Sequence, residues 1–307
     1  MSEAMIEPAA VALGSEREPT TPPRGLWGTA LRQLFRNKSA LVGMTMLAVI
    51  LIMAVFAPLI ATHPPNQVML GAGGARPRMG IGEGGFLLGT DGNGRDLFSR
   101  LIYGSRVSLV AGVGAVSFAV VCGTLIGLFA GYFGGWLDST LMRLMDVLLA
   151  FPSLLLAIFI VTVFGAGLIN AILAIAIVSI PAYARVIRSA VLSIRETDFV
   201  KADVVLGVST ARIIMHRVLP NSLTPLIVQA TLGVATAVLE VAALSFLGLG
   251  VQPPTAEWGS MLSGERNQVF TSPHLVFLPG LLIMWNVLAF NLLGDGLRDA
   301  LDPRLAK

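Results

Sequence analysis

The chain has 307 residues, of which 55% are hydrophobic and only 13% charged, and its formal net charge is +3. A soluble domain usually carries about 25% charged residues. The mean hydropathy of +0.79 also implies more apolar surface than a soluble protein of this length can bury. The composition therefore excludes most soluble enzymes and predicts an all-α polytopic membrane protein. The small cationic excess gives no indication of nucleic-acid binding.

The N-terminal region divides into two parts. Residues 1–23 are polar and rich in proline and glutamate, so we expect a disordered cytoplasmic tail. Residues 24–38 carry apolar side chains at helical spacing, namely Trp27, Leu31, Leu34 and Phe35. Arg32 and Arg36 lie one turn apart on another face. This pattern predicts an amphipathic helix in the inner membrane interface, although the basic flank of a first span gives the same pattern.

Long stretches without charge predict six membrane spans, because about 20 apolar residues cross the roughly 30 Å hydrocarbon core. The spans are expected at about 40–61, 107–130, 145–164, 168–187, 223–249 and 275–293. The third and fourth come from one uncharged stretch that we divide at Gly165-Ala166-Gly167, a turn signal. Residues 40–307 are thus expected to form a single six-helix domain with an outer loop over residues 62–106.

Six spans place both termini on the same side of the membrane. If that side is the cytoplasm, the inner segments hold 15 of the 21 lysines and arginines. This bias predicts cytoplasmic N and C termini, since inner loops are enriched in cations. Five arginines in the outer loop run against the trend.

Signatures of catalysis are missing from the sequence. A phosphate-binding loop needs a lysine after a glycine-rich turn, and none of Lys38, Lys201 and Lys307 follows a glycine. The three histidines do not share a helical turn, so a zinc motif is absent as well. We therefore expect a non-catalytic chain without a cofactor or metal of its own. Glu240 is the one ionisable residue well inside a span, and a hydrogen bond to a neighbouring helix or subunit is the favoured explanation.

The cytoplasmic segment 189–221 is the longest inner loop. Phe199–Leu206 is expected to form a short helix that Gly207 ends, since glycine adopts the left-handed conformation cheaply. A second helix is expected over Thr210–Val218, closed by Pro220.

The caps of both helices are also predicted. Thr197 or Asp198 is expected to cap the first helix, and Ser209 the second. The two helices would form a knob suited to docking onto a partner; its apolar residues are Phe199, Val200, Val204 and Leu206. A plain amphipathic connector is the alternative.

This segment resembles the cytoplasmic loop of ABC importer permeases. The family signature is Glu-Ala-Ala, three residues, Gly, nine residues, Ile, one residue, then Leu-Pro. Here the matching positions are Ala202, Gly207, Leu219 and Pro220. The departures are Lys201 and Asp203 in the first triplet and Arg217 in place of isoleucine.

Further stretches are similar to permeases of the dipeptide and oligopeptide class. They are Leu88–Leu109 before the second span, Tyr183–Arg188 at the end of the fourth, Glu240–Gly250 with Pro253-Pro254 and Trp258-Gly259, and Phe290–Arg304 at the C terminus. Together they cover about residues 25–305.

The resemblance implies a transmembrane subunit of a bacterial inner-membrane ABC importer for di- or oligopeptides, with the type I permease fold. Implied partners are a second permease, two ATPase subunits or one fused ATPase that hold ATP and Mg²⁺, an extracytoplasmic binding protein, the peptide and the lipid bilayer. The expected ATPase-coupling residues are Phe199, Ala202, Asp203, Leu206, Gly207, Leu219 and Pro220. Trp258 and Glu257 are expected to contact substrate or binding protein, although a tryptophan of the interfacial belt fits equally well. Glutathione and nickel-chelate permeases remain alternatives, as does a stand-alone secondary transporter.

Overall fold

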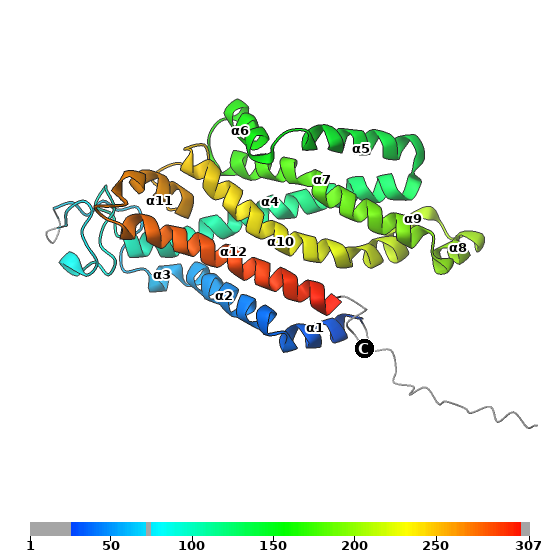
Figure 1. Cartoon of the computed structure of the whole chain (residues 1–307), viewed down its shortest axis with the longest axis horizontal. Helices are drawn as coiled ribbons and strands as arrows, with labels where there is room; N and C mark the ends of the chain where they lie inside the picture. Colours follow the sequence, from blue (N-terminus) through cyan, green and yellow to red (C-terminus); the bar gives the residue numbers. More distant parts are fainter. Residues whose placement is uncertain (1–25, 72–74, 302–307) are drawn as a thin grey trace, which may run out of the picture.

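A computed structural model of the chain describes residues 26–71 and 75–301, and these residues form an elongated bundle of helices (Figure 1). The segment expected to be a disordered tail, residues 1–23, lies outside the described residues. In chain order the α-helices are α1 (Leu26–Arg36), α2 (Lys38–Val55), α3 (Ala57–Ile60), α4 (Leu97–Phe133), α5 (Gly135–Leu149), α6 (Ser153–Phe164), α7 (Leu168–Arg195), α8 (Asp198–Val205), α9 (Thr210–Ile213), α10 (Leu219–Phe246), α11 (Trp258–Glu265) and α12 (His274–Leu301). The remaining turns are η2 (Glu83–Gly85), the π-helix η3 (Ile214–Val218) and η4 (Arg266–Gln268).

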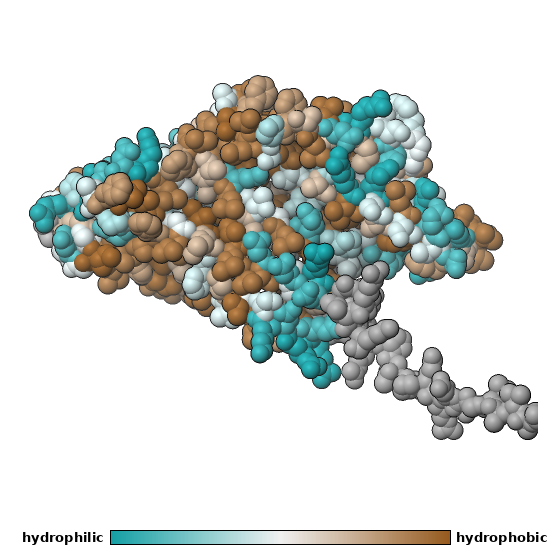
Figure 2. All heavy atoms as spheres, viewed as in Figure 1, coloured by the Kyte–Doolittle hydropathy of each residue, from teal (hydrophilic) through white to brown (hydrophobic). Residues whose placement is uncertain are grey.

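Five segments of the described chain are long and apolar enough to cross a membrane. They are α2, α4, α7, α12 and the continuous stretch Thr210–Phe246. A sixth span exists if the pair α5 and α6 is counted as one, and these two helices meet at a bend of 90°. Figure 2 shows hydrophobic side chains over the middle of the molecule and hydrophilic ones toward its two ends. The multi-pass helical fold expected from the sequence is therefore confirmed.

The third predicted span, 145–164, differs in the structure because it is divided at residues 150–152. The helix α6 begins after Pro152, which has no N–H to continue the helix and restricts Phe151 to an extended conformation. With 12 residues, α6 is about 18 Å long and too short to span the bilayer alone. The expected turn at Gly165–Gly167 is present, and Gly165 has φ of 98°, a value that favours glycine.

The centre of the bundle is the close packing of α4 on α7 (Figure 1). Gly123, Gly127 and Gly131 lie one turn apart on α4 and face the backbone of α7. A Cβ atom at Gly127 would overlap the carbonyl oxygen of Ala184. Such stripes of small residues let helices approach closely within a membrane, where packing rather than the hydrophobic effect drives association.

The helices α1 and α2 pack beside α12 at the other side of the bundle. Asn37 separates α1 from α2, and its side chain caps α2 by accepting from the backbone N–H of Ser39 at 3.0 Å. Leu34 is buried against Ala40 and Ala300. The side chains of Trp27 and Leu31, on which part of the amphipathic pattern rests, lie outside the described part. The N-terminal helix and the end of α12 lie at the same end of the molecule, as expected from an even number of spans (Figure 1).

At the opposite end, the segment between α3 and α4 forms an irregular loop over α11 (Figure 1). The helix α4 begins at Leu97, ten residues before the predicted start of its span, because Asp96 caps it by accepting from the N–H of Ser99 at 3.0 Å. We call this end the outer cap, defined as residues 61–71 and 75–96, the linker 247–257 and α11.

Candidate functional site

The loop predicted to couple to an ATPase, called the coupling loop below and defined as residues 196–220, projects from the end of the bundle that also holds α1 (Figure 1). It begins at Glu196 rather than at Ser189, since α7 continues to Arg195. The helix α8 covers nearly the predicted residues and ends at Val205, two residues before Gly207, whose φ is 74°. The N–H of Gly207 donates to Val204 and that of Val208 to Asp203, at 3.1 and 3.0 Å. This pair of bonds is a Schellman motif, and it requires the left-handed residue that glycine supplies.

The predicted N-caps are confirmed in position but not in their side-chain hydrogen bonds. Thr197 and Ser209 occupy the N-cap positions of α8 and α9, but neither side chain makes a capping hydrogen bond. The hydroxyl of Thr197 donates instead to the carbonyl of Ile194, at 2.6 Å. Thr197 thus joins α8 to the end of α7.

The predicted closure of the second helix at Pro220 is wrong. The chain passes from α9 through the π-helix η3 into α10 without leaving helical geometry. Proline fits there because it lies in the first turn of α10. Asn221 donates to the carbonyl of Arg217 at 2.6 Å, and the hydroxyl of Ser222 to that of Val218 at 2.8 Å. The second arm of the coupling loop, residues 210–220, is therefore a continuous helical extension of a membrane-crossing helix.

Apolar side chains of α8 divide into an inner anchor and an outer surface. Val200 is buried in the main core, with 1% of its surface exposed. The prediction that Val200 is available for contact with a partner is therefore wrong. Val205 and Leu206 are 86% and 78% exposed, and Phe199 and Val204 are exposed as well. Val205 was not predicted from the sequence, because only the orientation of its side chain after folding distinguishes it from Val200.

All three departures from the family signature take part in ion pairs within the loop. Arg217 Nε lies 2.8 Å from Asp203 Oδ2, which joins η3 to α8. Lys201 Nζ lies 3.2 Å from Glu196 Oε2, and this hydrogen-bonded partner lowers the pKa of Glu196. Of the other predicted coupling residues, Ala202 and Pro220 are exposed, whereas Leu219 packs against the core.

The root of the coupling loop is tied to α4 and α5. Arg195 Nη1 donates to the carbonyls of Tyr132 and Gly131, at 2.9 and 3.3 Å. Arg188 makes a bidentate pair with Asp138, with N···O distances of 2.5 and 2.6 Å. The end of α7, from which the loop continues, is thus bonded to both α4 and α5.

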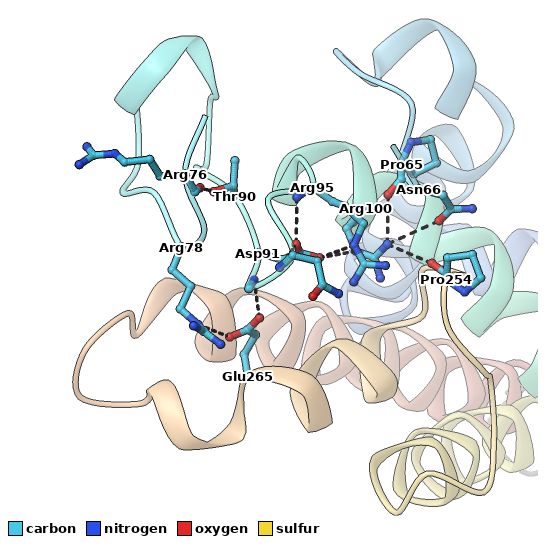
Figure 3. Close-up of polar contacts among 12 residues, drawn as sticks. Pro65, Asn66, Arg76, Arg78, Thr90, Asp91, Arg95, Arg100, Pro254 and Glu265 are labelled. Atoms are coloured by element: carbon cyan, nitrogen blue, oxygen red, sulfur yellow. Dashed lines mark hydrogen bonds and ion pairs between the residues drawn. The ribbon is translucent and has the colours of Figure 1, made fainter. Parts of the chain in front are cut away.

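The outer cap is organised around Asp91 (Figure 3). Its Oδ1 accepts from the N–H groups of Asn93 and Arg95, both at 2.9 Å, and its Oδ2 from Arg95 Nε at 2.7 Å. Arg100 is buried and its Nη1 donates to the carbonyls of Pro65 and Pro254, at 3.0 and 3.1 Å. One guanidinium therefore joins the outer loop to the linker before α11.

A second clamp joins the outer loop to the far end of α11 (Figure 3). Glu265 accepts from Arg78 Nε at 2.9 Å and from the N–H of Gly92 at 2.6 Å. Glu265 was not predicted from the sequence, because its partners lie 187 and 173 residues away. The resemblance of Leu88–Leu109 to peptide permeases pointed to one side of this contact.

Glu257 and Trp258, expected to contact substrate or binding protein, lie inside the protein. Trp258 is completely buried, and its Nε1 donates to the carbonyl of Leu101 at 3.0 Å. Glu257 caps α11 by accepting from the N–H groups of Gly259 and Ser260 at 2.9 and 2.8 Å. Burial raises the pKa of Glu257 despite these bonds. In this conformation both side chains hold α11 against α4 and neither presents a surface to a partner.

Glu240 faces neighbouring helices of the same chain. Its half-buried carboxylate lies beside Ser153 in the first turn of α6. In the described residues, no group of three or more histidine, cysteine or acidic side chains has the arrangement of a metal site.

Comparison with known proteins agrees with these features. Residues 123–307 match the sequence model of a family described as "Binding-protein-dependent transport system inner membrane component". Residues 25–73 match the N-terminal TM domain of oligopeptide transport permease C.

Individual relatives match along nearly the whole chain. The dipeptide transport system permease protein DppC of Alkalihalophilus pseudofirmus is 46% identical over 301 residues, which cover 94% of this chain and 95% of the relative. The di/tripeptide transport system permease protein DppC of Pseudomonas aeruginosa is 47% identical over 292 residues, with 94% and 96% covered. The glutathione transport system permease protein GsiD of Escherichia coli is 41% identical, with 91% of each chain covered.

Two solved structures of the MetNI methionine ABC transporter in inward facing conformations have TM-scores of 0.54 and 0.55. The match covers 66% of this chain and 96% and 97% of theirs at 20% identity, which supports the type I importer fold. On the combined matches, the chain belongs to the family of binding-protein-dependent transport system inner membrane components, the multi-pass permease subunits of ABC importers.

Proposed function

We propose that this chain imports di- and oligopeptides as one of two permease subunits in the inner membrane. Its partners are a second permease, ATPases that bind ATP and Mg²⁺, and an extracytoplasmic binding protein that delivers the peptide. The chain supplies the path and the mechanical link, and the ATPases supply the chemistry. Peptide is the proposed substrate because relatives at 46% and 47% identity are named as dipeptide and di/tripeptide permeases.

The observation that carries the proposal is the exposed apolar surface of α8 at the end of the bundle opposite the outer cap (Figures 1 and 2). Exposed Val205 and Leu206 lie beyond the membrane-crossing helices, so lipid does not account for them. A cleft on an ATPase is the partner we propose, with Phe199, Ala202 and Gly207 in the same surface. The bias of 15 of the 21 lysines and arginines toward this side of the six spans supports a cytoplasmic location for this end.

The helical continuity of the second arm with α10 suggests how movement of the coupling loop would reach the membrane helices. Closure of the ATPases would displace α8, and the Asp203–Arg217 pair would carry that movement into η3 and α10. The other end of α10 leads into the linker that Arg100 holds through Pro254. The displacement caused by ATP binding would therefore reach the outer cap, where the binding protein docks. Glu257 and Trp258 act there by positioning α11.

A substitution at Gly207 tests the coupling role. Gly207→Val forces a β-branched residue to a φ of 74°, which costs roughly 1–2 kcal/mol and disturbs the turn. We expect the complex to assemble and hydrolyse ATP while peptide uptake falls at least tenfold. Gly28→Val is the matched control, because space around Gly28 is open. Normal coupled uptake by Gly207→Val would contradict the proposal.

A second experiment separates this function from that of a stand-alone carrier. The chain is affinity-purified from its native membrane, and ATPase and second permease subunits are expected to copurify. Solute flux driven by an ion gradient, with no ATPase present, would overturn the proposal. Relatives named as glutathione permeases make this γ-linked tripeptide the second candidate substrate. Competition between a labelled dipeptide and glutathione for uptake decides between them.

A further inference from the structure

The outer cap contains a cavity of about 210 Å³ between the turn at residues 91–95, the linker and α11. Figure 3 shows the charged residues around it. Its wall carries the side chains of Arg78, Asp91, Arg95, Arg100 and Glu265. Met261, Leu275 and Pro253 add an apolar part. Three guanidinium groups thus face two carboxylates, which leaves one positive charge in excess.

Both carboxylates are already used by groups of the cap itself. Asp91 accepts from two backbone N–H groups and from Arg95 Nε, and Glu265 from Gly92 and Arg78 Nε. Each carboxylate therefore fixes a turn as well as an arginine. Asp91 also forms an ion pair with Arg100, whose Nε lies 3.3 Å from Oδ2, so two carboxylates serve three guanidinium groups.

The unused hydrogen-bond donors belong to the arginines. Arg78 and Arg95 bond to their carboxylates through Nε, and within the described residues their terminal nitrogens have no hydrogen-bond acceptor. Arg100 Nε is buried, lies 3.3 Å from Asp91 Oδ2 and makes no hydrogen bond there. A guanidinium presents five donors in a planar fork that matches a carboxylate.

We propose that this cavity is a binding site for a carboxylate, held by the terminal nitrogens of Arg78 and Arg95. The apolar part of the wall limits water and strengthens such charge-assisted bonds. The carboxylate can come from the C terminus of a peptide or from an acidic side chain of a docked binding protein. Both sources rest on the proposed function, and the two are distinguished by experiment.

The test uses the complete transporter in nanodiscs, with Arg95→Gln as the variant. Arg76→Gln is the matched control, because Arg76 is in the same loop but its side chain points away from the cavity in Figure 3. Arg95→Lys keeps the charge and should recover part of the binding, which a purely structural loss would not do. Two quantities are measured: the affinity of the unloaded binding protein for the transporter, and the direct binding of dialanine and its C-terminal amide, followed by ligand-observed NMR without binding protein.

Each outcome has a defined meaning. A binding-protein affinity about tenfold weaker in Arg95→Gln, equivalent to about 1.4 kcal/mol, identifies an acidic side chain as the source. If Arg95→Gln loses the preference for free dialanine over its amide while the affinity for the binding protein is unchanged, the peptide C terminus is the source of the carboxylate. If Arg95→Gln behaves as Arg76→Gln in both measurements, the carboxylate site is refuted. Peptide uptake by the wild-type complex then still supports the proposed function, so the two failures are distinguishable.

Discussion

Arg217 and Asp203 form an ion pair, with Arg217 Nε 2.8 Å from Asp203 Oδ2, and this pair joins the two arms of the coupling loop. Both residues depart from the signature that the loop otherwise resembles. In this chain the link between α8 and η3 is therefore a charged pair.

The first prediction concerns this pair. Arg217→Ala and Asp203→Ala should each reduce the ATPase stimulation that accompanies peptide uptake, whereas the exchange Asp203→Arg with Arg217→Asp should restore most of it. The coupling energy should be about 0.2–1 kcal/mol, since the Arg217 side chain is 55% exposed and water screens the charges. A double-mutant cycle on the affinity for the ATPase measures it. Arg212→Ala, an exposed arginine on the same arm, is the control, and additive effects of the two alanine variants would refute the link.

The second prediction separates docking from folding within α8. Val205→Asp places a charge on an exposed position and should abolish copurification of the ATPase while the permease stays folded. Val200→Asp places the same charge in the core and should unfold the loop, because an unpaired buried charge is strongly destabilising. Size-exclusion chromatography in detergent and pull-down distinguish the two effects. Retention of the ATPase by Val205→Asp would mean that α8 docks elsewhere.

The third prediction concerns the packing of α4 on α7. Gly127→Ala should destabilise the protein, because the new methyl group overlaps the carbonyl oxygen of Ala184. The expected cost is about 1–3 kcal/mol, reduced by up to about 1 kcal/mol through the better helix propensity of alanine. Gly114→Ala on the same helix meets only ordinary contact with Ile172, at 3.7 Å, and should be neutral or stabilising. Thermal unfolding in detergent tests both, and equal melting temperatures would show that the stripe is not close-packed.

The fourth prediction is a pH dependence from Glu257, whose pKa is raised by burial from its ordinary value of 4.5. For a carboxyl group with a raised folded pKa, the unfolded chain loses its proton first as the pH rises. The Glu257 contribution to stability is therefore complete below about pH 4.5 and is lost as the pH rises through the folded pKa. Glu257→Gln cannot titrate and should flatten the fall in melting temperature as the pH rises above about 4.5. Glu83→Gln, which removes an exposed carboxylate, should keep the wild-type slope; the same slope in both variants would contradict the assignment.

Structural features that depend on composition or on neighbouring residues were predicted correctly from the sequence. The long apolar stretches predicted the membrane helices because the bilayer thickness sets their length. Gly207 predicted the end of α8 because few residues other than glycine adopt the left-handed turn. Pro152 lies at a break just before α6 begins, whereas Pro220 lies within a continuous helical path. The difference is that Pro220 falls in the first turn of α10, where its missing N–H is not needed.

By itself, the sequence determined the class of protein, the course of most spans, the family resemblance and the turn at the tip of the coupling loop, since each depends on composition or neighbouring residues. Only the tertiary structure decided which apolar side chains of α8 face outward, that Asp203 meets Arg217, and that Trp258 is buried against α4. It also brought Arg78 to Glu265 across 187 residues of chain. These relationships depend on how distant helices pack against one another, and side-chain overlap and pairing of charges select one packing among the many that the same pattern of spans allows.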